Sequence, residues 1–275
     1  MEIAEAIRKE ASRRKYSPRT IETYQKCVER FFCYCGKEPK EVTKKDVKEF
    51  LEDLDNNGKS GGTIHVYLNS LKFFFEDVLR RNMQIDIRYS RRPGKLPFVL
   101  SKDEVKKLFG KISNWKHRLM IELLYGAGLR VSELINIKIK DLKIDSNYGF
   151  VRQGKGNKDR MFIIAETIKS KIIELIKNEG LQNEDNLFLT NRKEKYSVRS
   201  LQVIVKDAAK LAGLNYKEIH CHTLRHSFAT HLIEQGQSVS EVQSLLGHKS
   251  PETTMIYLHT STLSMINIKS PLDNF

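Results

Sequence analysis

The stretch His222-Thr223-Leu224-Arg225-His226 is followed by Gly247-His248 and then by Tyr257 in a chain of 275 residues. This spacing can bring imidazoles, a guanidinium and a phenol to one point. A phenol can act as a nucleophile, and a planar guanidinium can hold two non-bridging oxygens of a phosphodiester at once. The pattern therefore predicts a catalytic site that attacks a phosphodiester.

Two stretches upstream supply further candidates. Arg130 follows a Gly-Ala-Gly-Leu sequence, and with Arg225 it can replace a metal-ion clamp, because two guanidiniums can neutralise the charge that spreads over a phosphoryl group. Glu133 is expected to orient Arg130. Lys155 lies in a glycine-rich turn and can protonate the leaving oxygen, and Lys158 in the same turn is the alternative.

The phenol needs a partner, because its ordinary pKa of about 10 makes it a poor nucleophile at neutral pH. His222 is the first candidate base, and His248 is expected to hydrogen-bond the phosphate or to shift its charge in the transition state. The plain alternative for Tyr257 is a core tyrosine among apolar neighbours. His226 and His231 are expected to serve in packing or hydrogen bonding.

Six of these residues resemble the catalytic set of the tyrosine recombinases, or phage-type integrases, and most of all that of the Xer-type resolvases, especially the archaeal ones. They match it in type, order and approximate spacing: Arg130, Lys155, His222, Arg225, His248 and Tyr257. The resemblance runs from about residue 98 to Tyr257 and includes an N-terminal DNA-binding domain. It implies a mainly α fold with a small antiparallel β-sheet (α+β), in which a SAM-like helical bundle precedes an integrase-type catalytic domain.

The resemblance also implies site-specific DNA recombination without a cofactor. Tyr257 would form a 3′-phosphotyrosyl bond and release a 5′-hydroxyl, which re-attacks on a partner duplex, so that bond energy is retained. The implied partners are double-stranded DNA and further copies of the chain, as a dimer or as a tetramer on two duplexes. Chromosome dimer resolution, integration of a mobile element, type IB topoisomerase-like relaxation and DNA binding by an inactive site all remain open.

Composition favours the same class of partner. The net charge of +14 indicates an acidic partner, and nucleic acid is favoured over membrane because no apolar run approaches the ~20 residues that a span requires. The first residues do not resemble a signal peptide, so we expect a cytoplasmic, nucleoid-associated protein. The spacing of the cysteines does not fit a zinc site, so we expect reduced thiols and no metal at Cys27, Cys33, Cys35 and Cys221.

A basic stretch with two prolines and a glycine divides the chain, because such a sequence does not continue a helix. We expect an N-terminal helical DNA-binding domain over 1–88, a linker over 89–97, and a catalytic domain with a C-terminal tail over 98–275. Basic side chains at this division are predicted to lie along DNA: Arg88, Arg91, Arg92 and Lys95. A second basic group is predicted to bind DNA or to form a solvated face: Arg13, Arg14, Lys15 and Arg19.

Apolar spacing and capping residues predict the elements. In the first domain they predict helices over 18–35, over 43–55 and from 60 or 63 to 81, with the phenylalanines in the core. In the second they predict a helix after a capping box at Ser101, strands over 139–144, 148–152 and 160–164, and helices over 115–126, 130–137, 167–178, 198–212, 223–235, 239–246 and 251–258. Residues 259–275 either dock on their own domain or pack into a neighbouring protomer.

Overall fold

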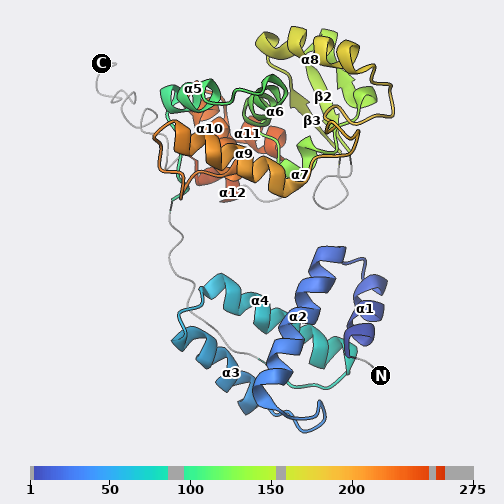
Figure 1. The fold of residues 1–275 in the computed structure, drawn as a ribbon. Coiled ribbons are helices and arrows are strands. Elements are labelled where there is room, and N and C mark those ends of the chain that lie inside the picture. Colours follow the sequence, from blue (N-terminus) through green and yellow to red (C-terminus); the bar gives the residue numbers. More distant parts are fainter. Residues whose placement is uncertain (1–2, 86–95, 153–158, 248–251, 258–275) are drawn as a thin grey trace, which may run out of the picture. The chain divides into compact units, whose positions relative to one another are not determined.

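The computed structural model describes residues 3–85, 96–152, 159–247 and 252–257. The chain divides into two compact units, Met1–Lys95 and Leu96–Phe275 (Figure 1). Each unit has its own hydrophobic core. The first unit is helical, and the second combines helices with a three-stranded antiparallel sheet. The expected mainly α fold with a small antiparallel sheet is confirmed. Much of the expected linker and the tail over 259–275 lie outside the described residues.

The first unit is a bundle of α1 (Ile3–Arg13), α2 (Pro18–Cys35), α3 (Lys44–Asn56) and α4 (Gly61–Lys72), continued by the π-helix η1 (Phe73–Val78). The predicted first residues of α2 and α3 are confirmed to within one residue. Each of these two helices begins at a local cap: Ser17 accepts a hydrogen bond from Thr20 N–H, and Thr43 forms a capping box with Asp46. The sequence did not predict α1 as a separate helix.

The predicted third helix was expected to continue to residue 81, but it changes to a π-helix at Phe73. Phe73, Phe74 and Phe75 are all buried. Successive residues of an α-helix point about 100° apart, so three neighbours do not share one face, and the wider π turn helps all three rings reach the core. Phe31 and Phe32 of α2 meet two of these rings edge-on. The prediction that the phenylalanines form the core is confirmed.

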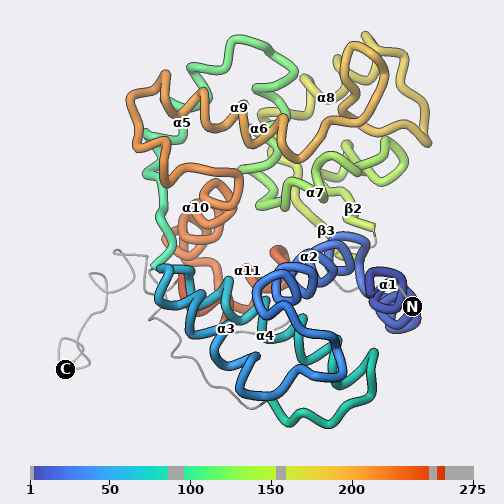
Figure 2. Tube along the Cα trace, turned by 60° about the horizontal axis from the view of Figure 1, so that its bottom comes forward, coloured from blue at the N-terminus to red at the C-terminus, as the bar shows by residue number. Residues whose placement is uncertain are grey.

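The second unit contains the following elements: α5 (Lys102–Gly110), α6 (Trp115–Gly126), α7 (Val131–Leu134), η2 (Ile139–Asp141), β1 (Leu142–Lys143), η3 (Ile144–Ser146), β2 (Tyr148–Val151), β3 (Arg160–Ile163), α8 (Glu166–Glu179), α9 (Val198–Leu211), α10 (Cys221–Glu234), α11 (Val239–Leu246) and α12 (Glu252–Met255). The sheet order is β1-β2-β3, and Val151 pairs with Arg160 where β2 and β3 approach the connecting turn. α5 and α9 lie side by side, and α11 lies against both α10 and β3 (Figure 2).

Three predicted elements are shorter than expected. The strand over 139–144 is reduced to Leu142–Lys143 between two 3-10 turns. The preceding backbone pairs elsewhere, because Ile139 N–H donates to Asp185 O and Leu187 N–H donates to Ile137 O. The helix over 130–137 is the single turn α7, and the helix over 251–258 is described only as α12.

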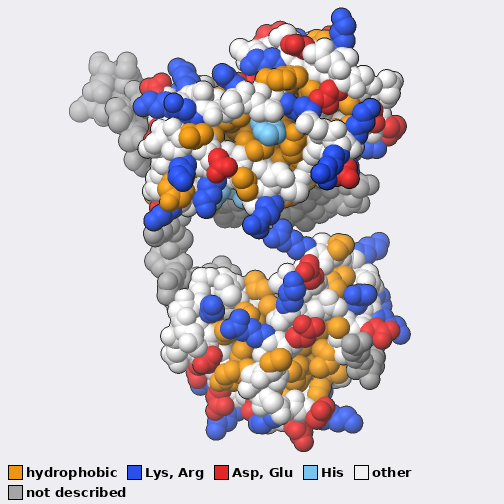
Figure 3. All heavy atoms as spheres, in the orientation of Figure 1, with side chains coloured by type: hydrophobic (Ala, Val, Ile, Leu, Met, Phe, Trp, Pro, Cys, Tyr) orange, Lys and Arg blue, Asp and Glu red, His pale blue; other side chains and the backbone are white. Residues whose placement is uncertain are grey.

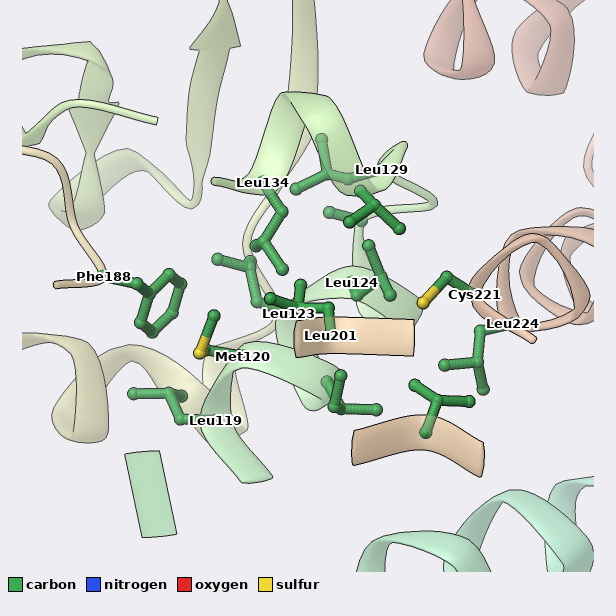
Figure 4. Close-up of a cluster of buried hydrophobic side chains, with 14 of the residues drawn as sticks. Leu119, Met120, Leu123, Leu124, Leu129, Leu134, Phe188, Leu201, Cys221 and Leu224 are labelled. Carbon is green, nitrogen blue, oxygen red and sulfur yellow. The ribbon is translucent and has the colours of Figure 1, made fainter. Parts of the chain in front are cut away.

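Helix α6 lies at the centre of the second core. Figure 4 shows Leu119, Met120, Leu123 and Leu124 of α6 packed among side chains that include Leu134 of α7, Leu201 of α9 and Leu224 of α10. All four α6 residues are at most 1% exposed. A helix with apolar residues on most of its faces is stable only when other elements surround it. The position of α6 therefore fixes the turn that follows it, where the first candidate arginine lies.

Candidate active site

The turn between α6 and α7 is shaped by Gly128. Its φ of +56° is in the left-handed region, and a Cβ atom there would lie 2.4 Å from a ring carbon of Phe228 on α10. Only glycine fits both the conformation and the close approach. The turn places the Gly128 carbonyl against α10 and leaves Arg130 in extended backbone as the N-cap of α7.

Arg225 of α10 ties three segments together. Its side chain is buried, and it donates hydrogen bonds of 2.5 Å to Gly128 O in the α6–α7 turn and to Leu246 O at the end of α11. Burial lowers the pKa of Arg225 to about 9, and the charge of Arg130 acts in the same direction, while Glu133 opposes it. The guanidinium is therefore still charged at neutral pH, and its plane is fixed by two carbonyls.

Glu133 holds two guanidiniums and lies near a third. Its Oε1 accepts a hydrogen bond of 2.6 Å from Arg130 Nη1, and its Oε2 accepts one of 2.6 Å from Arg160 Nη2. Arg225 Nη1 lies 3.8 Å from Oε2. Burial by itself would raise the pKa of Glu133, but the charges of Arg160 and Arg130 outweigh it and lower the pKa. One carboxylate among three guanidiniums leaves the cluster net positive, which suits an anionic ligand.

Arg160 is a site residue that the sequence analysis missed. From β3 its Nη1 donates to Leu245 O near the end of α11, and its Nη2 donates to Glu133. A Cβ atom on Gly247 would lie 2.6 Å from Arg160 Cδ, so the side chain packs directly on that glycine. Its buried Nε has no hydrogen-bond partner among the described residues. The available signal was strand alternation, because Arg160 lies on the same face of β3 as the buried Phe162.

Tyr257 follows α12 and is 2% exposed. It packs in a small apolar cluster that includes Phe228 and Leu246. Its hydroxyl lies 2.9 Å from His226 Nδ1. Burial raises the pKa of Tyr257, although the positive charges of Arg225 and Arg130 act in the opposite direction. The candidate nucleophile therefore lies within the field of both candidate clamp arginines.

The imidazole that the structure places at this hydroxyl is His226, for which the sequence predicted only packing or hydrogen bonding. Burial lowers the pKa of His226 to about 4, and the nearby charges of His222, His220 and Arg225 act in the same direction. His222, the first candidate base, is exposed at the start of α10, with its ring centroid 6.5 Å from that of His226. The motif favoured His222 as the base, and the contact of His226 with the hydroxyl depends on the fold.

Three candidate residues lie outside the described residues: Lys155, Lys158 and His248. The structure describes the backbone that leads to them. Val151 and Arg160 form the last described pair before the turn that carries both lysines. Gly247 ends α11 with a φ of +63°, directly before His248. In the sequence both lysines therefore lie between β2 and the strand that contributes Arg160, and His248 directly follows the glycine on which Arg160 packs.

The predicted DNA-binding residues of the first unit differ in their surroundings. Arg14 forms ion pairs with Glu10 at 2.9 Å and with Asp77 at 2.7 Å, and Arg13 also pairs with Glu10. Lys15 and Arg19 are exposed. Arg14 thus contributes to its own bundle. The other predicted contacts, Arg88, Arg91, Arg92 and Lys95, lie outside the described residues.

No group of three or more metal-ligating side chains occurs in the described parts of the chain, and all four cysteines are free thiols. Over the same residues no helix combines the length and the apolar character needed to cross a membrane. The described site therefore consists of arginines, a carboxylate, an imidazole and a phenol. Such a set can bind an anion and can supply an oxygen nucleophile.

Comparisons with known proteins find matches for both units of the chain. Residues 99–263 match the phage integrase family, and residues 3–85 match the N-terminal SAM-like domain of phage integrases. The chain is 36% identical to the tyrosine recombinase XerA of Pyrococcus horikoshii, over 90% of this chain and 85% of that protein. It is 35% identical to a tyrosine recombinase of Thermosipho africanus, over 90% and 91% of the two chains. The fold is also similar to a crystal structure of the XerH site-specific recombinase, solved as a post-cleavage complex with a palindromic difH substrate. The two structures superpose with a TM-score of 0.77 at 26% sequence identity, over 92% of this chain and 79% of that one.

Proposed function

The chain belongs to the phage integrase family and is a tyrosine-type site-specific DNA recombinase, and on that premise we propose that it cuts and rejoins DNA through a 3′-phosphotyrosyl bond at Tyr257. The observation that carries this proposal is the position of the phenol. Its oxygen is held by a hydrogen bond to His226, and the charges of Arg225 and Arg130 both act on it. A positive field around a buried phenol favours both phosphate binding and the developing phenolate.

In this proposal the two arginines hold the non-bridging oxygens of the scissile phosphate. Arg225 is fixed by two backbone carbonyls, and Arg130 is fixed by Glu133. A guanidinium has five donors in one plane, so it can be held on one side and still present a fork to an anion. Preorganised donors stabilise charge in a transition state without reorganising during the reaction. Arg160 would act on this clamp through Glu133.

Three further roles are proposed, two of them for residues outside the described parts of the chain. Lys155, or Lys158 in its place, would protonate the 5′-oxygen that leaves. His248 would hydrogen-bond the phosphate, and His222 at the start of α10 would assist proton transfer. The 5′-hydroxyl would then attack the phosphotyrosine on a partner duplex. The proposed assembly is a tetramer of the chain on two duplexes, with a dimer on each duplex. The reaction conserves bond energy, so it calls for no cofactor.

We propose that residues 1–88 bind DNA and that residues 98–275 carry out catalysis. Basic side chains occur over both units and are interspersed with acidic ones on the face drawn in Figure 3. Lys15 and Arg19 are the described candidates for phosphate contacts, and the linker would add Arg88, Arg91, Arg92 and Lys95. The proposed location is the cytoplasm, at the nucleoid. The proposed task is chromosome dimer resolution, supported by the similarity to XerA, while integration of a mobile element would use the same chemistry.

A plasmid assay tests the function. Supercoiled plasmids that carry sites selected from genomic DNA by binding are incubated with the protein, and covalent complexes are trapped with detergent. We expect protein attached to a 3′ end, mapped to Tyr257 by peptide mass spectrometry, together with recombinant junctions. The Tyr257→Phe variant should bind the same sites and form no covalent complex. Relaxed plasmid without junctions would instead indicate a type IB topoisomerase-like activity, and attachment in the Phe variant would refute the nucleophile.

A further inference from the structure

Helix α10 carries two histidines that each meet a tyrosine hydroxyl through Nδ1. His226 Nδ1 lies 2.9 Å from the Tyr257 hydroxyl, and His231 Nδ1 lies 2.8 Å from the Tyr125 hydroxyl. All four side chains are at least half-buried or buried. The two pairs are therefore alike in geometry and in burial, and a comparison between them isolates what is particular to the first pair.

The difference between the pairs is electrostatic. The pKa of Tyr125 is raised by burial and by the negative charge of Glu234. Burial also raises the pKa of Tyr257, but Arg225 and Arg130 partly offset the effect. The first pair thus lies in a field that stabilises a phenolate, and the second does not. A buried histidine and tyrosine pair is ordinary in a protein core, whereas one that faces two guanidiniums is suited to proton transfer.

We propose that His226 is a further catalytic residue, which accepts the Tyr257 proton as the phenol attacks phosphorus and returns it when the strand is rejoined. This inference rests on the proposed role of Tyr257 as nucleophile. It assigns the proton to a different imidazole from His222, the motif residue that the sequence alone favours.

The proton and electron balance of the step is complete. In the DNA-free protein both partners are neutral, so the phenol O–H can donate to Nδ1. As the Tyr257 oxygen bonds to phosphorus, its O–H bond breaks and the proton moves to Nδ1, which gives an imidazolium. The 5′-oxygen leaves with the electron pair of the P–O bond and takes a proton from the general acid. In the rejoining step an incoming 5′-hydroxyl attacks phosphorus and returns its proton to the deprotonated general acid, while the Tyr257 oxygen leaves with the electron pair of its P–O bond and recovers its proton from His226.

His226 is a weak base in the DNA-free protein, and we expect DNA binding to raise its affinity for a proton. The low pKa of His226 has burial as its main cause, followed by the positive charges of its neighbours. An entering phosphate brings a negative charge that favours the imidazolium. The charged and titratable groups that act on the pair are His220 before α10, His222 and Arg225 on α10, and Arg130 at α7, while Glu133 acts on His222. The base is thus weak without its substrate and stronger with it.

Single-turnover cleavage of a nicked suicide substrate tests the role with three variants. His226→Asn keeps a hydrogen-bond acceptor near the Nδ1 position but removes the base, and His226→Ala removes both. His231→Asn makes the same change in the matched pair with Tyr125. We expect a loss on the order of 10²–10⁴-fold at neutral pH for both His226 variants, the usual contribution of a general base, and a rate within a few-fold of the parent for His231→Asn. DNA affinity and thermal unfolding should be similar in the two Asn variants.

The pH profile separates a base from a residue that only orients the phenol. Without the base, the reaction depends on the small fraction of phenolate, which rises about tenfold per pH unit below the pKa of the phenol. The deficit of His226→Asn should therefore shrink steadily between pH 7 and 9. A parent-like rate for His226→Asn, combined with a slow His226→Ala, would reduce His226 to an orienting residue and overturn the proposal.

A substrate with a 5′-bridging sulfur tests which proton is affected. Its thiolate leaves without help from an acid, so it should not rescue His226→Asn, whereas it should rescue Lys155→Ala if Lys155 is the acid. Rescue of His226→Asn would move His226 to the leaving group and overturn the assignment. Failure of the proposed function would look different, because Tyr257→Phe would then still form covalent complexes. Parent-like cleavage by both His226 variants, with an inactive Tyr257→Phe, would refute this inference alone.

Discussion

At the scale of single residues, the site depends on buried charges that hold one another in place. Glu133 accepts hydrogen bonds from Arg130 and Arg160, and Arg225 spans two carbonyls. Removing one member of a buried charge cluster is costly, because the charges that remain are left without compensation. The same arrangement keeps the arginines rigid. The cluster therefore bears on stability, on its dependence on pH and on the rate of cleavage.

Glu133→Gln should destabilise the second unit by about 3–5 kcal/mol, the usual cost of breaking a buried ion pair. The control is Glu166→Gln, since Glu166 pairs with Lys169 at the surface with a side chain 71% exposed, and it should change little. Trp115 is the single tryptophan and lies in the second unit, so its fluorescence in a urea titration measures the effect. Equal stability of the two variants would contradict the prediction.

The same cluster predicts a pH dependence. The folded protein lowers the pKa of Glu133, so its carboxylate adds stability at pH values above its unfolded pKa. This contribution is lost as pH falls through the lower, folded pKa. Acid should therefore destabilise the parent more steeply than Glu133→Gln, which has no proton to take up there. Trp115 fluorescence between pH 7 and 3 gives both curves, and parallel curves would contradict the expectation.

Arg225→Lys should slow cleavage far more than it weakens DNA binding. The variant keeps the charge but cannot donate in one plane to both Gly128 O and Leu246 O, so the clamp loses its orientation. We expect a loss on the order of 10²–10³-fold, as for removal of a preorganised donor. Single-turnover cleavage and a binding titration measure the two effects. Cleavage within a few-fold of the parent would mean that Arg225 serves only the fold.

At the scale of elements, the end of α11 is held by the side chain of Arg160. Gly247 closes α11 in the left-handed region and lies against Arg160 Cδ. Gly180 closes α8 with nearly the same φ, +62° against +63°, but has nothing within 4 Å of its Cβ position. The two glycines form a matched pair, because they share the backbone requirement and differ in packing.

Gly180→Ala should cost about 1–2 kcal/mol, the price of a left-handed conformation for a residue with a side chain. Gly247→Ala should cost ~1–3 kcal/mol more, because the new methyl group must displace Arg160. It should also slow cleavage, since it moves the segment that leads to His248. Trp115 fluorescence and single-turnover assays measure both effects. Equal costs at the two glycines would mean that Arg160 yields without strain.

The helices and strands also show which parts of the structure could be predicted from the sequence. Helices with a side-chain cap at their start, such as Ser17, Thr43 and Ser101, were predicted at nearly their observed starts, because a cap is a local interaction. The π-helix and the short β1 were not predicted, because they depend on contacts between distant segments. The site follows the same rule. The motif indicated Arg130, Arg225 and Tyr257, whereas Arg160 and the contact between His226 and Tyr257 emerged only from the fold.

At the scale of the whole molecule, the net charge of +14 predicts DNA binding that depends on salt. The logarithm of the association constant should fall linearly with the logarithm of salt concentration. Changing both Lys15 and Arg19 to Gln should reduce the slope by about 1.8, since each phosphate contact contributes about 0.9. Arg14→Gln should leave it unchanged, because Arg14 is paired with Glu10 and Asp77. Fluorescence anisotropy at several salt concentrations gives the slopes, and an unchanged slope in the double variant would exclude both side chains from the interface.

The burial of Tyr257 has a consequence for the cell. A strongly basic protein meets random DNA far more often than its target. The proposed reaction would open a strand without ATP hydrolysis, so no nucleotide-dependent step would precede cleavage. With 2% of its surface exposed, the phenol is out of reach during these casual encounters. Each ~1.4 kcal/mol needed to uncover it makes a stray break ten times rarer. On the proposed role of Tyr257, its burial would limit breaks at random sequences, because only a target site would supply enough binding energy to bring a phosphate to the hydroxyl beside His226.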